Sequence, residues 1–236
     1  LTPSGQFLVE RAREILNMVE KTTLDIQEQE QNLTGSIAMG AGEYQATEVL
    51  AKLIGGFQKQ YAAVSFELFT SSADLLHDKL DKGLLDVAIL QAPVDTTNYD
   101  YLRLPIRETW CVLMRSDAPL ASKNAITASD LRGLPIILPT RLQARSEIFN
   151  WLSGDVAKMR FIGNSNLLAN TAVFVEQCGY YGICVQMPLL DEKRFAYRPL
   201  TPALHSDILL VWRRDRQQSL ALQKFLQFAK CFLSIE

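Results

Sequence analysis

Apolar side chains near the N-terminus recur in alternating steps of four and three residues. The positions that form this stripe are Leu8, Ala12, Ile15, Val19, Thr22, Ile26, Gln29 and Leu33. Such steps place side chains along one side of an α-helix, as in the seam of a coiled coil. A helix of about 30 residues is about 45 Å long, and its single stripe needs a partner. Its own domain could provide that partner, but the length favours a second chain, so we expect residues 1–33 to pair two chains. The side chains expected at that dimerisation surface are Leu8, Ala12, Ile15, Val19 and Ile26.

From residue 34 onward, short apolar runs alternate with amphipathic segments. The runs that predict strands are 36–39, 64–69, 85–90, 101–114, 135–138, 158–162, 183–186 and 208–212. The segments that predict helices are 46–60, 73–82, 143–152, 167–177 and 218–232, with a helical turn at 128–131. Strand–helix–strand order predicts parallel sheets with right-handed crossovers. Because the long extended stretch separates two similar sets, the pattern predicts an α/β fold with two Rossmann-like subdomains.

The bulk composition changes this picture little but excludes several classes of protein. The chain has 236 residues, of which 48% are hydrophobic and 21% charged, enough for one large or two modest cores. It has no run of about 18 uncharged apolar residues, as a membrane-spanning helix would need. Its N-terminus also has no cationic segment followed by an apolar segment, as a secretory signal would have, so we expect a cytoplasmic protein without membrane association. A net charge of −2 and a pI near 5.8 argue against tight nucleic-acid binding by this segment itself.

Catalytic and cofactor motifs are absent or incomplete. Four scattered cysteines, without Cys-x-x-Cys, predict buried reduced thiols, and two histidines distant from them predict no metal site. Gly40-Ala41-Gly42 begins like a dinucleotide fingerprint, but Gln45 stands where the third glycine belongs. We therefore expect no cofactor, no catalytic residues and no enzymatic activity, and interpret this turn as a tight one whose backbone N–H groups face a cleft.

Polar loops follow most of the predicted parallel strands. Open α/β sheets bind ligands outside the carboxyl ends of their strands, and most of these loops lead into a helix whose N-terminus presents N–H donors. Ordinary capping explains each loop taken alone, but their common position predicts one site for a small polar or anionic ligand. Arg141 would pair with an acidic group of that ligand, the alternative being a plain surface cation. The expected contacts are Gly42, Glu43, Tyr44, Thr70, Ser71, Ser72, Gln91, Thr140, Arg141 and Asn164.

Several strings, taken in order, resemble one family. LTPSG followed by FLVERAREILNMVE is similar to the end of the winged helix-turn-helix and the linker helix of LysR-type transcriptional regulators. GSIAMGAGEYQATEVLAKLIGGFQKQYAAVSFEL and LHDKLDKGLLDVAIL resemble the start of that family's sensor domain. APLA at 118–121, ITASDLRGLPIIL and ICVQMP complete the order. The resemblance covers essentially the whole chain.

This resemblance implies a sensor built like a type 2 periplasmic-binding protein, with the long helix as linker. Its two subdomains would be joined by two crossover strands, near 106–113 and 206–212. Residues 34–106 and 206–236 would form the first subdomain and 107–205 the second. A small-molecule effector between them would modulate DNA binding by a winged helix-turn-helix that lies upstream of this chain, in a homodimer or tetramer.

Other interpretations stay open, both of the ligand and of the function. Tyr44 stands where the family often has a serine or threonine that touches the ligand, which predicts a differently shaped or aromatic-stacking effector. A solute-binding protein of the same two-lobed fold is an alternative function, and a small-molecule enzyme on that fold is a third.

Overall fold

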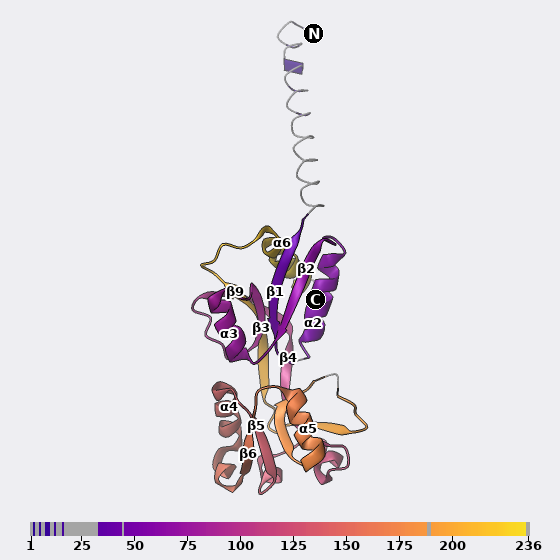
Figure 1. Cartoon of the computed structure of the whole chain (residues 1–236), viewed down its shortest axis with the longest axis vertical. Helices are drawn as coiled ribbons and strands as arrows, with labels where there is room; N and C mark the ends of the chain where they lie inside the picture. Colours follow the sequence, from indigo (N-terminus) through magenta and orange to yellow (C-terminus); the bar gives the residue numbers. More distant parts are fainter. Residues whose placement is uncertain are drawn as a thin grey trace.

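The computed structural model describes residues 33–43, 45–187 and 190–234, together with residues 2, 5, 8, 9, 12 and 16. Two α/β lobes lie one beyond the other along the long axis of the molecule (Figure 1). Of the predicted dimerisation helix, Ile15, Val19 and Ile26 lie outside the described residues. Leu8 and Ala12 are helical and exposed, and the pairing role of this segment stays a prediction.

The first lobe contains the predicted alternation of strands and helices. Its elements are β1 (Gly35–Ala41), α2 (Thr47–Gln58), β2 (Val64–Thr70), α3 (Ala73–Lys82), β3 (Val87–Gln91), the start of β4 (Tyr99–Arg115), β9 (His205–Arg213) and α6 (Leu220–Leu233). β1 pairs in parallel with β2 and β3, while β9 runs antiparallel to β3 and β4. The order β2-β1-β3-β9-β4 places the three parallel strands together, so that their carboxyl ends share one edge.

The second lobe repeats this plan with shorter strands. Its elements are the 3₁₀ helices η1 (Pro119–Ser122), η2 (Ala128–Leu131) and η3 (Ser153–Lys158), with β5 (Pro135–Pro139), α4 (Leu142–Leu152), β6 (Arg160–Ser165), α5 (Leu168–Cys178), β7 (Tyr181–Val185) and β8 (Phe195–Pro199). β5 pairs in parallel with β6 and β7, and the end of β4 runs antiparallel between β7 and β8.

Two long strands connect the lobes. β4 pairs with β9 from Tyr99 to Thr109 and then with β7 from Trp110. The register of β4 against β9 shifts between Arg103 and Arg107, around Pro105, which has no N–H to give to a ladder. The chain therefore crosses between lobes on two paired strands, one of them irregular at the crossing. The division into 34–106 with 206–236, and 107–205, stays a proposal.

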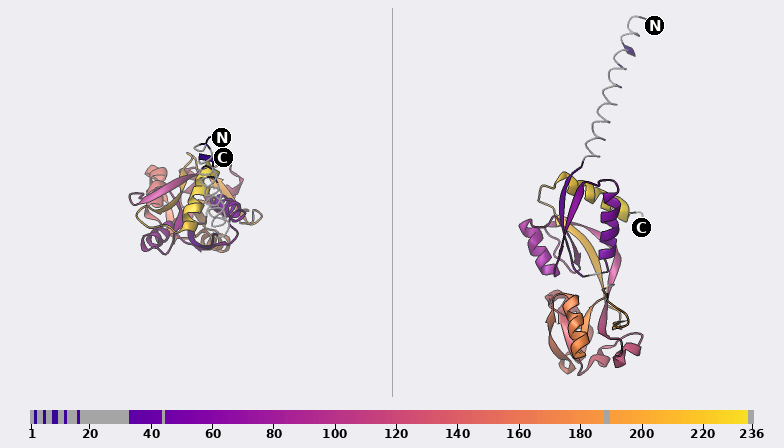
Figure 2. Two further views of the ribbon diagram at one scale, coloured as in Figure 1. Left: turned by 90° about the horizontal axis from the view of Figure 1, so that it is seen from above. Right: turned by 45° about the vertical axis from the view of Figure 1, so that its right-hand side comes forward.

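Helices cover both faces of the sheet in each lobe. In the first lobe α2 and α6 pack on one face and α3 on the other (Figure 2). Phe57 of α2 is fully buried, and its ring lies 5.4 Å from that of Phe225 and 6.0 Å from that of Phe66. In the second lobe α4 and α5 pack against separate apolar clusters. Each lobe thus has its own core.

The predicted fold class is confirmed: the described chain is an α/β protein with two such lobes. The sequence pattern missed β8 and two of the 3₁₀ helices. The expectation of buried thiols is wrong for Cys178 and Cys231, which are exposed, although all four cysteines are free. None of the helices in the described part of the chain has the length and apolarity needed to cross a bilayer.

Gly40 has a packing role. A Cβ at this position would lie 2.7 Å from Cδ1 of Leu85 and 2.8 Å from Cδ2 of Leu76. Such distances are closer than side-chain atoms normally approach. The glycine therefore lets β1 approach the buried side chains of α3 and the turn before β3, which accounts for it without a nucleotide.

We expect Leu53→Ala to lower the free energy of unfolding by about 2–5 kcal/mol, because it leaves a cavity in the core of the first lobe. The Leu53 side chain is 0% exposed, whereas Leu84 is 58% exposed. Leu84→Ala is therefore the matched control, with an expected change within about 0.5 kcal/mol. Urea denaturation followed by circular dichroism compares the two, and equal losses would contradict the assigned core.

Candidate functional site

A cavity lies between the two lobes, where the carboxyl ends of their parallel strands face each other. It holds about 800 Å³ of space between the atoms, part of it open to solvent. From the first lobe it is lined by Gly42, Glu43, Ser71, Ser72, Ala73, Asp74 and Gln91. From β4 and the second lobe it is lined by Trp110, Ile137, Leu138, Pro139, Thr140, Arg141, Ala144, Ser165, Asn166, Leu167, Leu168, Thr171, Ile183, Cys184 and Val185. Its position is that of a small-molecule site in an open α/β protein.

Most of the expected ligand contacts lie in this inter-lobe cavity. Gly42, Glu43, Ser71, Ser72, Gln91, Thr140 and Arg141 line it together. Thr70 and Asn164 do not: both are exposed residues of strands β2 and β6. Tyr44 lies outside the described residues. The neighbours that line the cavity instead are Ser71 and Ser72, which follow β2, Ser165, which ends β6, and Asn166, which follows it.

The sequence reasoning missed the apolar wall of the cavity. Leu138 ends the buried part of β5, and Ile183 and Val185 belong to β7. In the sequence these residues look like ordinary core, because nothing in a short apolar run tells which strand borders a cavity. Asn166 had a signal, since it ends the same polar loop as Asn164.

Arg141 connects the lobes across the mouth of the cavity. Its side chain is 12% exposed, and its Nη1 donates to the backbone carbonyl of Gln91 at 2.5 Å. Nη2 donates to the carbonyl of Pro93, and Nε lies 3.6 Å from Oδ1 of Asp74. The guanidinium is thus bound to the first lobe while its backbone belongs to the second. The predicted pairing of Arg141 with an acidic ligand group stays a prediction.

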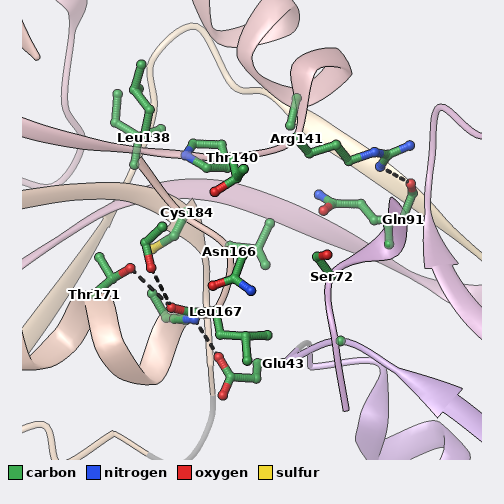
Figure 3. A pocket seen from close by; sticks show the side chains of 18 of the residues that line it. Glu43, Ser72, Gln91, Leu138, Thr140, Arg141, Asn166, Leu167, Thr171 and Cys184 are labelled. Carbon is green, nitrogen blue, oxygen red and sulfur yellow. Dashed lines mark hydrogen bonds between the residues drawn. The ribbon is translucent and has the colours of Figure 1, made fainter. Parts of the chain in front are cut away.

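Glu43 connects the lobes in the opposite direction. Its Oε2 accepts from the backbone N–H groups of Leu168 and Ala169, at 2.5 Å and 3.0 Å. These are donors of the first turn of α5, which a helix leaves without an internal partner. A carboxylate is also favoured there by the positive end of the helix dipole. A side chain of the first lobe therefore caps a helix of the second (Figure 3).

A second carboxylate, Glu108 of β4, caps the start of α2. It is fully buried, and its Oε1 accepts from the N–H of Ala46 at 2.9 Å. Burial raises the pKa of Glu108, although hydrogen bonds from the backbone of Ala46 and Gln45 oppose that shift. The donors that begin α2 are therefore bound to the crossing strand, and sequence reasoning, which saw only a strand residue, had no signal for this.

Gln91 supplies a free donor inside the cavity. Its side chain is 6% exposed, and among the described residues its Nε2 has no hydrogen-bond partner. Its amide points into the space bordered by Ser72, Thr140 and Asn166 (Figure 3). A buried donor without a partner is costly, so a bound molecule that accepts from it would gain that free energy.

The arrangement of the cavity is suited to binding a small molecule. Hydroxyls and amides lie opposite an apolar wall, and no group of three or more His, Cys, Asp or Glu in the described residues could hold a metal ion. The fold and the cavity together define a two-lobed α/β ligand-binding domain. The family described as LysR substrate binding domain matches residues 30–234, and the chain belongs to this family, as its motifs predicted.

Relatives agree with this assignment. The uncharacterized HTH-type transcriptional regulator YvbU of Bacillus subtilis (strain 168) is 24% identical over 234 residues, which cover 98% of this chain and 78% of that protein. A probable RuBisCO transcriptional regulator of Emiliania huxleyi is 28% identical over 68% of this chain, and the match spans 52% of its own length. These relatives are named as transcriptional regulators, and none of these names is that of an enzyme.

Solved structures show the same fold. The effector binding domain of QuiR in complex with shikimate superposes with a TM-score of 0.74 at 16% identity, covering 86% of this chain and 99% of that one. HinK, a LysR family transcriptional regulator from Pseudomonas aeruginosa, has a TM-score of 0.68 at 20% identity, covering 99% and 81%.

We expect Glu108→Gln to make stability less dependent on pH. Because the folded-state pKa of Glu108 is raised above its ordinary value of 4.5, the stability that its protonated form contributes is present below that value and is lost as the pH rises through the folded pKa. Glutamine does not ionise and keeps an acceptor for Ala46. The free energy of unfolding of the variant, measured by urea denaturation, should therefore increase relative to that of wild type between pH 4 and pH 8. If the two free energies change in parallel with pH, ionisation of Glu108 does not cost stability.

Proposed function

We propose that this chain is the effector-binding and dimerisation region of a LysR-type transcriptional regulator. A small polar molecule would bind in the inter-lobe cavity and modulate DNA binding by a winged helix-turn-helix that precedes this region in the full-length protein. The observation that supports this is a cavity walled by both lobes, with an unpartnered buried amide at Gln91. Such a protein acts on DNA in the cytoplasm, without catalysis.

The walls of the cavity suggest how binding would be transmitted. A molecule that touches Ser72 on one side and Asn166 on the other contacts both lobes at once. It would favour one relative placement of the lobes, because a ligand shifts an equilibrium by its differential affinity for the two states. The crossing strands β4 and β9 would carry that placement through both lobes. Coupling to DNA binding would follow as a free energy shared between two sites.

Several structural neighbours are regulators with a bound small molecule or DNA, which is consistent with this role. The QuiR domain is in complex with shikimate, and the CcmR regulatory domain of Synechocystis PCC6803 is in complex with 2-PG. Full-length CbnR is in complex with its target DNA. These ligands belong to those proteins, and for this chain they support a small molecule as the class of effector.

Dimerisation is supported by the edges of the sheets as well as by the predicted N-terminal helix. β2 is an edge strand that exposes Leu68 and Phe69, and β6 is the edge strand at the other end, exposing Phe161 and Ile162. Exposed apolar edge strands invite pairing and are usually covered. We therefore propose that a second copy covers these edges in a homodimer, with assembly to a tetramer as a further possibility.

Ligands found by a thermal-shift screen of metabolites should lose their effect in Asn166→Trp. A ligand at 100 times its Kd stabilises the folded state by about 2.7 kcal/mol, and an indole at position 166 would occupy part of the cavity. Asn150→Trp is the control, because Asn150 is an exposed residue of α4 that does not line the cavity. A ligand that stabilises Asn166→Trp and wild type equally would place the binding site elsewhere.

Leu68→Asp should weaken the dimer, raising its dissociation constant by about tenfold or more, because a carboxylate would be buried without a partner. Leu68 is 63% exposed in the single chain. Leu84→Asp adds the same charge at a similarly exposed leucine away from the sheet edges. Sedimentation velocity across a concentration series measures both, and an unchanged dimer in Leu68→Asp would exclude the β2 edge from the interface.

A further inference from the structure

The charged side chains that line the cavity are all engaged within the chain. Among the described residues they are Glu43, Asp74 and Arg141, two carboxylates and one guanidinium, so the wall has a formal charge of −1. Arg141 is bound to backbone carbonyls and has Asp74 beside it. Glu43 is bound to the first turn of α5. Among the described residues Arg141 Nε has no hydrogen-bond partner, but Oδ1 of Asp74 lies 3.6 Å from it, so a carboxylate already opposes the positive charge there.

The N-terminus of α5 is one place in this cavity where an anion would otherwise bind; the start of α3 is another, but Asp74 in its first turn places a carboxylate there. Backbone N–H groups and the helix dipole make such an end a general anion site. Here the carboxylate of Glu43 accepts from the N–H groups of both Leu168 and Ala169. A carboxylate or phosphate of a ligand would have to displace Glu43 and remain near its negative charge. The chain therefore fills the anion site of α5 with its own carboxylate.

Apart from Arg141 Nε, the side-chain donors left for a ligand are uncharged. Gln91 Nε2 is more than nine-tenths buried and unpartnered, and the Ser72 side chain makes no capping hydrogen bond at the start of α3. The amide of Asn166 faces the same space (Figure 3). Opposite them lies the apolar wall of Leu138, Ile183 and Val185. A side-chain amide donates to carbonyl, hydroxyl and carboxylate oxygens alike, so the surrounding charges decide which of them binds.

We infer that the effector of this chain is an uncharged molecule with a hydrogen-bond acceptor at one end and an apolar face along its side. The acceptor binds Gln91 Nε2 and the apolar face packs on β5 and β7. Glu43 determines this specificity by occupying the N-terminus of α5, and an anionic effector paired with Arg141 is thereby disfavoured. This inference rests on the proposed function, because it assumes that the inter-lobe cavity is the effector site.

Benzamide and benzoate test the inference, since they share one ring and differ in charge. Titrations of ¹⁵N-labelled protein follow the side-chain amide of Gln91 and the backbone amides of Leu168 and Ala169. In wild type, benzamide should shift the Gln91 amide with an affinity at least about tenfold higher than that of benzoate. In Glu43→Ala, the affinity for benzoate should rise by about tenfold or more, with new shifts at Leu168 and Ala169, while that for benzamide changes by less than about threefold.

Two further variants control the comparison. Glu43→Gln keeps an acceptor for the α5 donors while removing the charge. It should therefore also raise the affinity for benzoate, and it serves as the test if Glu43→Ala disturbs the contact between the lobes. Glu48→Ala removes a carboxylate from an exposed position on α2 outside the cavity and should leave both affinities unchanged.

The outcomes separate this inference from the proposed function. Benzoate binding to wild type as tightly as benzamide, or no gain in either Glu43 variant, overturns the inference and leaves the cavity as an effector site. An absence of shifts at Gln91 with both probes in every variant overturns the inference and the proposed function together.

Discussion

Backbone donors and acceptors that face the cavity need partners, and this requirement organises the space between the lobes. Turns from strand to helix leave N–H and C=O groups without internal bonds, and burial makes each unbonded group costly. The chain satisfies them with side chains from across the boundary. Glu43 of the first lobe caps α5 of the second, and Arg141 of the second holds carbonyls of the first. Charged hydrogen bonds of this kind are stronger than neutral ones.

These contacts give the two lobes a defined relative position before any ligand binds. Glu108 adds a third constraint, because it fastens the start of α2 to the crossing strand β4. On the proposed function, a ligand in the cavity would act on a boundary already held by specific bonds, and its effect would depend on which of them it strengthens or replaces. The backbone carbonyl of Gln91 accepts from Arg141, while its side-chain Nε2 has no partner among the described residues. A ligand bound to that Nε2 would therefore also affect the contact made by Arg141.

The sequence predicted the candidate site at the level of loops. The rule that ligands bind beyond the carboxyl ends of parallel strands led to Ser71, Gln91 and Thr140, which do line the cavity. It failed at Thr70 and Asn164, which the sequence placed in loops but which still belong to strands β2 and β6 and do not line the cavity. It also treated Arg141 and the N-terminus of α2 as free for a ligand, since the sequence does not show which partner a polar group finds.

By itself the sequence determined the alternation of strands and helices, the two-lobed α/β class and the family, because these follow from local periodicity and ordered motifs. Only the tertiary structure decided which polar groups remain available to a ligand. Glu43 and Leu168 are 125 residues apart in the chain, and Arg141 and Gln91 are 50 apart. Their pairing depends on how the crossing strands position one lobe against the other. That is a property of three-dimensional packing, and no local pattern of residues records it.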